Sequence, residues 1–117
     1  MLCFITYQKT IKHIDQIVEI LVQEFPHIKT IIQNINERHD NVILGDEEKI
    51  LYGQGYIYDT LLKNQYKISL KSFYQINPIQ VEVLYQTAID LAHLNQDSVV
   101  LDAYCGIGTI TFHLQNM

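Results

Sequence analysis

Up to about residue 70, the chain alternates between short runs of β-branched and aromatic residues and one helical stripe of apolar residues. Thr10 can cap that helix, and Pro26 ends it because proline lacks an amide hydrogen. The apolar positions of the helix recur at gaps of three and four residues and are Ile11, Ile14, Val18, Leu21, Val22 and Phe25. The β-rich runs predict strands over residues 2–7, 28–35, 42–44, 49–52, 56–58 and 66–69. One helix with several hairpin-linked strands indicates an α+β fold.

The pattern changes near Ser72. Asn77 is suited to cap a helix that has Pro78 at its first position and runs to about residue 93. We expect the buried positions of this helix to be Ile79, Val83, Leu84, Ala88, Leu91 and Ala92. Residues 98–103 form a continuous apolar run, typical of a strand buried on both faces of a parallel sheet, and a further helix begins at residue 109 or 110. Because a parallel strand needs a second strand to pair with, we expect a chain truncated at Met117.

Composition agrees with a small folded domain. The chain has 117 residues and 13.7 kDa, is 48% apolar and 18% charged, and has a mean hydropathy of +0.02. No apolar run approaches the roughly 20 residues of a membrane helix, and no secretion signal is visible. The net charge of −5 shows no basic surface for RNA phosphates. We expect a cytoplasmic protein without a membrane segment, whose function depends on local motifs.

The most informative motif is LDAYCGIGT, residues 101–109. It joins the apolar run to a helix through a carboxylate, Asp102, and a Gly-x-Gly turn at Gly106 and Gly108. Glycines let a backbone approach a ligand closely, and cofactor clefts lie beyond the carboxyl ends of parallel strands. A dinucleotide fingerprint needs a third glycine where Thr111 stands, so an adenosyl cofactor with a cationic sulfonium fits better than NAD. A plain strand–turn–helix connection remains the alternative.

The segments SFYQINP and VLDAYCGIGT, at this spacing, closely resemble motifs of the RNA (uracil-5-)-methyltransferases that act on 23S ribosomal RNA and tRNA. The upstream stretch QNINERHDNVILGDEEKILYG is similar to their central α+β domain. The resemblance implies that residues 1–71 are part of that domain. It also implies that residues 72–117 are the first βα elements of a Rossmann-like α/β methyltransferase domain that uses S-adenosyl-L-methionine.

The same resemblance implies particular cofactor contacts. Gln75 and Tyr104 match residues that contact the cofactor, and Thr109 stands where some members have an asparagine with that role. Without the resemblance, Gln75 would be read as a residue that stabilises a turn, and Tyr104 as an aromatic residue that caps the sheet. Asp102, Gly106 and Gly108 complete the expected cofactor-binding set.

The catalytic residues are expected elsewhere. In this family a cysteine thiolate adds to C6 of the uracil and a general base removes the C5 proton. The resemblance places that cysteine beyond residue 117, so we expect this chain alone to be inactive. Cys105 lies in the cofactor loop, and Cys3 lies in an apolar strand, where it is typical of a buried thiol. The five histidines share no metal-ligand spacing with each other or with cysteine, so no metal is expected.

The leading hypothesis is therefore S-adenosylmethionine-dependent methylation of uridine C5 in ribosomal RNA (23S) by the full-length enzyme, with tRNA as another RNA partner. A second hypothesis is a catalytically inactive remnant that binds RNA or a protein partner. A third keeps the methyltransferase fold but gives it a DNA or protein substrate.

Overall fold

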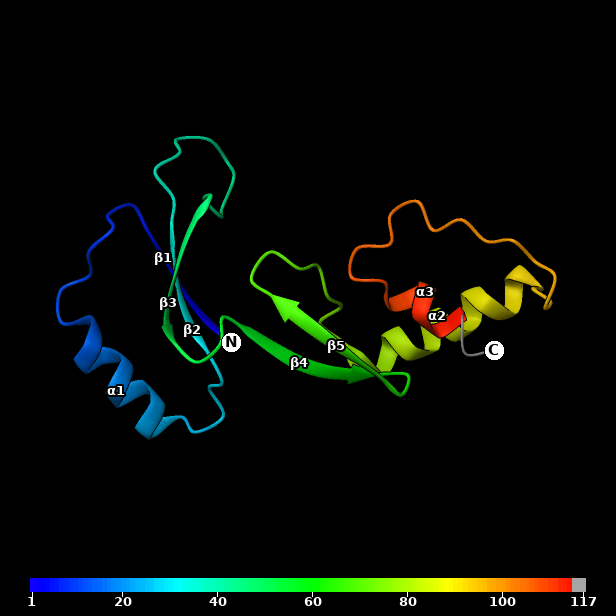
Figure 1. Ribbon diagram of the computed structural model, residues 1–117, viewed down its shortest axis with the longest axis horizontal. Helices are drawn as coiled ribbons and strands as arrows, with labels where there is room; N and C mark the ends of the chain where they lie inside the picture. Colours follow the sequence, from blue (N-terminus) through cyan, green and yellow to red (C-terminus); the bar gives the residue numbers. More distant parts are fainter. Residues whose placement is uncertain (115–117) are drawn as a thin grey trace. The chain divides into compact units, whose positions relative to one another are not determined.

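The computed structural model describes residues 1–114, which divide into two compact units (Figure 1). The first unit consists of Met1–Ile57 with Ser69–Lys71, and the second of Tyr58–Ile68 with the residues from 72 onward. The elements, in chain order, are β1 (Leu2–Thr6), α1 (Ile14–Glu24), β2 (Ile31–Ile35), β3 (Glu47–Tyr52), β4 (Tyr56–Leu61), β5 (Asn64–Ser69), α2 (Pro78–Ala92) and α3 (Thr109–Leu114). No helix of residues 1–114 is long and apolar enough to cross a membrane.

The first unit is built on a three-stranded sheet in the order β1-β2-β3. β1 runs parallel to β2, with Leu2 opposite Ile31, and β2 runs antiparallel to β3, with Ile35 opposite Glu47. The parallel pair requires a crossover, which α1 supplies. All five residues of β2, the central strand, are buried, whereas the edge strand β3 is exposed at five of its six positions.

A long loop over residues 36–46 leaves β2 and is tied back to it by asparagine amides. The completely buried Asn34 donates from Nδ2 to the carbonyl of Gly45 (3.1 Å) and accepts from its amide nitrogen through Oδ1 (2.7 Å). Asn36 donates to the carbonyls of Val42 and Ile43 at 2.7 and 2.8 Å. A side chain at Gly45 would collide with the backbone of β2, so glycine is required at this close approach.

In the second unit, the hairpin β4–β5 packs with α2 and α3. The core of this unit is formed by Leu61, Tyr66, Ile68, Val81, Tyr85 and Ile89. Helix α2 begins as the sequence predicted: Oδ1 of Asn77 accepts the amide of Gln80 (3.1 Å), and Pro78 is the first helical residue. The predicted end near His93 is also confirmed, because His93 caps the helix in a left-handed conformation.

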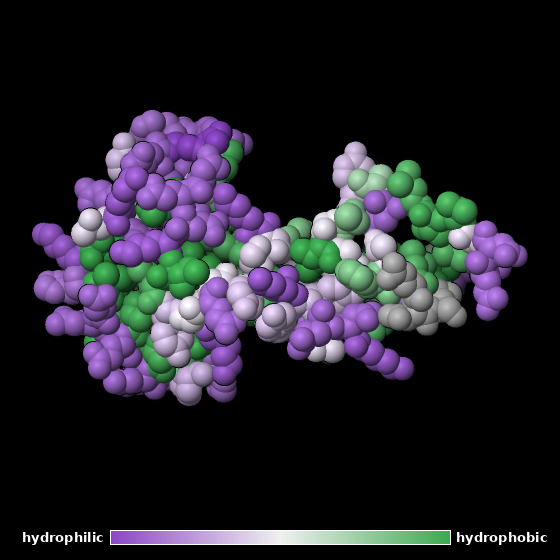
Figure 2. Space-filling view, in the orientation of Figure 1, coloured by the Kyte–Doolittle hydropathy of each residue, from purple (hydrophilic) through white to green (hydrophobic). Residues whose placement is uncertain are grey.

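The predicted buried face of α2 is wrong. The helix buries Val81, Tyr85 and Ile89, spaced by four residues, whereas the expected core positions are exposed. These are Ile79, Val83, Leu84, Ala88, Leu91 and Ala92. Apolar residues surround much of this helix, so periodicity could not choose the face. The hairpin and α3 decided it, and Figure 2 shows apolar residues at the surface of this unit.

Residues 98–103 do not form the predicted strand. None of the described strands pairs with them, and Val99 and Leu101 are 100% and 88% exposed. A strand is stable only where its backbone groups are bonded to a neighbour, and none is present among residues 1–114. The α+β expectation for the first part therefore agrees with the structure, whereas the Rossmann-like sheet is not formed by the described residues.

Smaller differences concern the ends of elements. Helix α1 begins at Ile14 after His13 in a left-handed conformation, rather than after a Thr10 cap. The predicted strand at residues 42–44 is part of the loop, whose carbonyls are bonded by Asn36 instead of by a strand. The strands β3, β4 and β5 are each longer than the runs that predicted them.

Candidate cofactor site

The glycine loop adopts a conformation that its sequence demands. Gly106 and Gly108 have φ values of 57° and 82°, in the left-handed region that glycine enters at least cost. The amide of Gly108 donates to the carbonyl of Cys105 (2.8 Å), which closes a tight turn. The amide of Phe112 donates to the carbonyl of Gly108 (2.9 Å) and begins α3, the helix predicted at this place.

Asp102 lies beside this loop and is bonded to α3. Its Oδ2 accepts the hydroxyl of Thr111 at 2.8 Å. Both residues line a surface hollow of about 250 Å³, together with Ser98, Val100 and Leu114. In the sequence, Thr111 stands out only as the position of a missing glycine. The bond from Thr111 to Asp102 could have been anticipated, because a hydroxyl in the first turn of α3 lies near the residues that precede the glycine loop.

Thr109 is directed into the packing of the second unit. Its hydroxyl lies 3.0 Å from the hydroxyl of Tyr85, and its carbonyl accepts the hydroxyl of Tyr66 (3.2 Å). These two tyrosines fix the start of α3 against α2 and β5. Sequence reasoning did not find either tyrosine as a support of the loop, because the three residues are far apart in the chain.

Tyr104 and Gln75 are not brought into the hollow beside Asp102. The side chain of Tyr104 is 98% exposed, and Gln75 is half-buried in the segment before α2. Of the six residues expected to bind the cofactor, Asp102 lines this hollow, and Gly106 and Gly108 shape the turn. The other five residues of the expected set do not line this hollow.

The loop nevertheless suits an adenosyl cofactor in part. A Cβ placed on Gly106 would meet nothing within 4 Å, so the backbone there is open to a ligand, and Asp102 provides a nearby negative charge. The hollow of about 250 Å³ is smaller than the ~300–1,000 Å³ of typical ligand pockets. The residues present thus fit one portion of the cofactor.

The two cysteines occupy different environments. Burial raises the pKa of the Cys3 thiol, which lies in β1 and is half-buried. Cys105 is exposed in the glycine loop. Within residues 1–114, no three His, Cys, Asp or Glu side chains converge as a set of metal ligands.

Burial also perturbs two tyrosines of this unit: it raises the pKa of Tyr66 and, to a larger degree, that of Tyr74. The hydroxyl of Tyr74 is buried, and burial, reinforced by the negative charge of Asp59, raises its pKa to about 12. Tyr74 packs against Tyr66 with ring centroids 6.4 Å apart. It therefore anchors the segment that carries Gln75 to the core of the second unit.

Comparison with known proteins finds relatives that are named as RNA methyltransferases. No family model matches the chain. It is 52% identical over 110 residues to an uncharacterized RNA methyltransferase of Streptococcus mutans, covering 94% of this chain and 24% of that protein. It is 44% identical over 114 residues to an uncharacterized RNA methyltransferase of Oceanobacillus iheyensis, covering 97% of this chain and 25% of that protein. The chain thus spans about a quarter of the length of these relatives.

A solved structure shares the fold. The tRNA (uracil-54, C5)-methyltransferase of Pyrococcus abyssi, in complex with S-adenosyl-L-homocysteine, matches 96% of this chain and 25% of its own, with a TM-score of 0.68 and 24% sequence identity. The chain is therefore similar to one part of proteins named as RNA methyltransferases, and it shares its fold with a tRNA (uracil-54, C5)-methyltransferase. These relatives agree with the resemblance to the RNA (uracil-5-)-methyltransferases that the sequence motifs indicate.

Proposed function

We propose that this chain is part of an S-adenosyl-L-methionine-dependent enzyme that methylates C5 of uridine in RNA. The observation that carries the proposal is the identity of 44–52% with RNA methyltransferases over nearly the whole chain. The shared fold with a uracil-C5 methyltransferase supports the choice of base and of carbon atom. When bound, the cofactor supplies an electrophilic methyl group on a sulfonium.

In this proposal the second unit contributes to holding the cofactor. The backbone at Gly106 and Gly108 approaches it, and Asp102, held by Thr111, faces it with a negative charge. Tyr104 and Gln75 offer further contacts from the surface of the unit. Thr109 acts as a positioning residue, because its hydroxyl is already paired with that of Tyr85.

The nucleophile is the part of the mechanism that this chain does not supply. Addition to C6 of uracil requires a cysteine thiolate close to the bound base. Cys3 is in a strand of the first unit with its pKa raised, which disfavours the thiolate, and Cys105 lies in the turn assigned to the cofactor. We therefore assign the nucleophile to sequence outside residues 1–117, and we expect residues 1–117 alone to be inactive.

The substrate we propose is 23S ribosomal RNA in the cytoplasm, with tRNA as the alternative. The solved tRNA enzyme is only 24% identical in sequence to this chain, so it supports the fold rather than the choice between 23S RNA and tRNA. The domain assignment, with a central domain over residues 1–71 and the start of the methyltransferase domain over 72–117, is part of the same proposal.

Deletion of the gene that encodes this chain tests the proposal. Digestion and mass spectrometry of 23S RNA and tRNA should show one or more 5-methyluridines missing from the mutant. Loss from 23S RNA supports the proposed substrate, and loss from tRNA alone supports the alternative. Unchanged 5-methyluridine in both RNAs would overturn the methyltransferase assignment in favour of a binding remnant.

Complementation locates the catalytic part. Returning the complete gene should restore the methylation, whereas returning residues 1–117 alone should not. Restoration by residues 1–117 would show that the nucleophile lies within them. In that case Cys105→Ser and Cys3→Ser would identify which thiol acts.

A further inference from the structure

A second hollow lies at the turn of the hairpin β4–β5. Its volume is about 490 Å³, and it is lined by Leu62, Lys63 and Asn64 of the turn, Gln86 of α2 and His113 of α3. This volume lies within the ~300–1,000 Å³ of small-molecule sites. No residue of the expected cofactor set lines it, so it is separate from the glycine loop.

The turn that forms one wall is strained. Leu62 and Lys63 have φ values of 49° and 68°, so both residues of this two-residue turn are left-handed. Such turns favour Asn-Gly, because those residues tolerate positive φ. Leucine and lysine have no conformational advantage at these two positions of the turn. Backbone strain of this kind is typical of positions retained for binding.

Polar atoms around the hollow are left available. Nε2 of His113 is buried and has no hydrogen-bond partner within the described part of the chain. A buried polar atom without a partner is costly, so a ligand atom that bonds to it gains affinity. Nε2 of Gln86 donates to Asp90 (2.8 Å), which leaves the carbonyl oxygen of Gln86 as an acceptor.

The local charges select the kind of ligand. Lys63 brings one positive charge, but Oε1 of Glu82 accepts the amide of Leu62 (3.2 Å) and Asp90 bonds to Gln86, so two carboxylates flank the hollow. A bare anion is therefore disfavoured. A neutral, flat group with donors and acceptors along one edge matches Lys63, Gln86 and His113, and Leu62 offers it an apolar contact.

We propose that this hollow binds an unpaired pyrimidine base, with an RNA strand as the source of the base. The base carbonyls accept from Lys63 and His113, and its N–H donates to Gln86. Recognition of RNA commonly uses unstacked bases that bond along their edges. The inference rests on the proposed function for the identity of the polymer, whereas the geometry of the hollow stands by itself.

The test is a binding titration of the full chain, in which binding is detected by NMR from the imidazole resonances of His113. The probes are uridine 5′-monophosphate and a uridine-rich RNA oligonucleotide. We expect a saturable shift of the His113 signals with both probes, and tighter binding of the oligonucleotide. Equal affinity for the two probes would overturn the RNA source and indicate a free nucleotide.

Two variants at exposed positions separate binding from folding. Gln86→Leu and Lys63→Gly should each weaken binding about fivefold to tenfold, since each removes one hydrogen bond to the base. Lys63→Gly should also raise the melting temperature, because glycine relieves the turn. Gln80→Leu, on the first turn of the same helix, is the matched control and should bind as the original chain does.

Two results would overturn the site. One is a His113 signal that does not move at saturating RNA, and the other is unchanged affinity in both Gln86→Leu and Lys63→Gly. Neither result bears on methylation, because the loss of 5-methyluridine in the deletion strain is measured without this chain. Failure of the base site and failure of the proposed function are thus distinguishable.

Discussion

Replacing Asn34 by alanine measures how much of the first unit depends on one buried amide. The Asn34 side chain makes two hydrogen bonds to Gly45, at 2.7 and 3.1 Å, and is completely buried. Alanine would leave the amide and the carbonyl of a buried glycine without partners. At about 1–3 kcal/mol for each of the two unsatisfied groups, the expected loss is about 2–6 kcal/mol of the free energy of unfolding.

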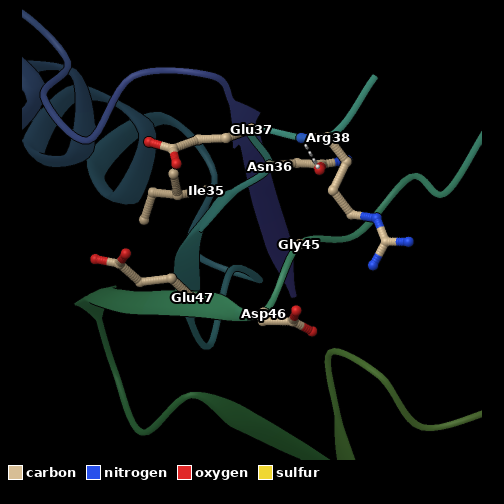
Figure 3. Close-up of a pocket in the computed structure, with 7 residues that line it drawn as sticks. All are labelled: Ile35, Asn36, Glu37, Arg38, Gly45, Asp46 and Glu47. Atoms are coloured by element: carbon tan, nitrogen blue, oxygen red, sulfur yellow. Dashed lines mark hydrogen bonds between the residues drawn. The ribbon is translucent and has the colours of Figure 1, made fainter. Parts of the chain in front are cut away.

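Asn36→Ala is the matched control, because Asn36 supports the same loop from a half-buried position through hydrogen bonds that solvent can reach. Its side chain donates to the carbonyls of Val42 and Ile43 and accepts the amide of Arg38 (3.0 Å). Water can replace these bonds, so the expected loss is about 1 kcal/mol despite the larger number of bonds. Figure 3 shows this region, where Asn36 and Arg38 lie beside Gly45, Asp46 and Glu47 around a hollow of about 250 Å³.

The assay should follow the first unit alone, because the chain divides into two compact units and a global unfolding signal would combine them. Hydrogen exchange of the β2 amides reports the opening free energy of that sheet. We expect the opening free energy to be highest in the original chain, slightly lower in Asn36→Ala and lowest in Asn34→Ala, with the larger step between the two variants. An equal or larger loss in Asn36→Ala would refute the reasoning that burial, rather than the number of bonds, decides the cost.

Three further predictions concern the second unit and the thiols. Gly108→Ala should destabilise α3 by about 1–3 kcal/mol, because its φ is 82° and a Cβ would lie 2.9 Å from an aromatic ring, whereas Gly106→Ala meets open space and should cost about 1 kcal/mol. Thermal melts compare the stability of the two variants. A larger loss of stability in Gly106→Ala would contradict the conclusion that Gly108 is the more restricted of the two glycines. Cys3, whose pKa is raised by burial, should react with iodoacetamide at pH 8 more slowly than the exposed Cys105, as followed by peptide mass spectrometry; equal rates would show that β1 opens readily. Tyr74 should ionise only at a pKa of about 12, so the folded state binds a proton that the unfolded state loses near pH 10. Stability should therefore fall as the pH rises from about 10 to 12, and Tyr74→Phe should remove that part of the fall in alkaline unfolding curves.

Local chemistry allowed several elements to be predicted from sequence. The cap at Asn77 and the proline at Pro78 define the start of α2 without any partner, since both act through their own backbone. The β-rich run that contains β2 is predicted as a strand from its isoleucines, whereas its polar residues Gln33 and Asn34 are buried because they have hydrogen-bond partners. The left-handed glycines at 106 and 108 follow from the Gly-x-Gly pattern.

The buried face of α2 depended on contacts that sequence does not display. Its apolar residues extend around the helix, and Tyr85 entered the core because it could bond to Thr109 across 24 positions. The same holds for Asn34, a polar residue whose complete burial is possible only because Gly45 returns to it. Sequence spacing cannot show a partner that folding brings from elsewhere.

The sequence by itself indicated the resemblance to RNA methyltransferases, the ends of α2 and the conformation of the glycine loop, because motifs and backbone preferences are local properties. Only the tertiary structure decided that residues 98–103 are not a strand among the described residues, and that His113 and Lys63 border one hollow. A strand requires a bonded neighbour and a hollow requires walls from several elements. The arrangement of the folded chain supplies the walls of the hollow but no bonded neighbour for residues 98–103, whatever the preferences of the individual residues.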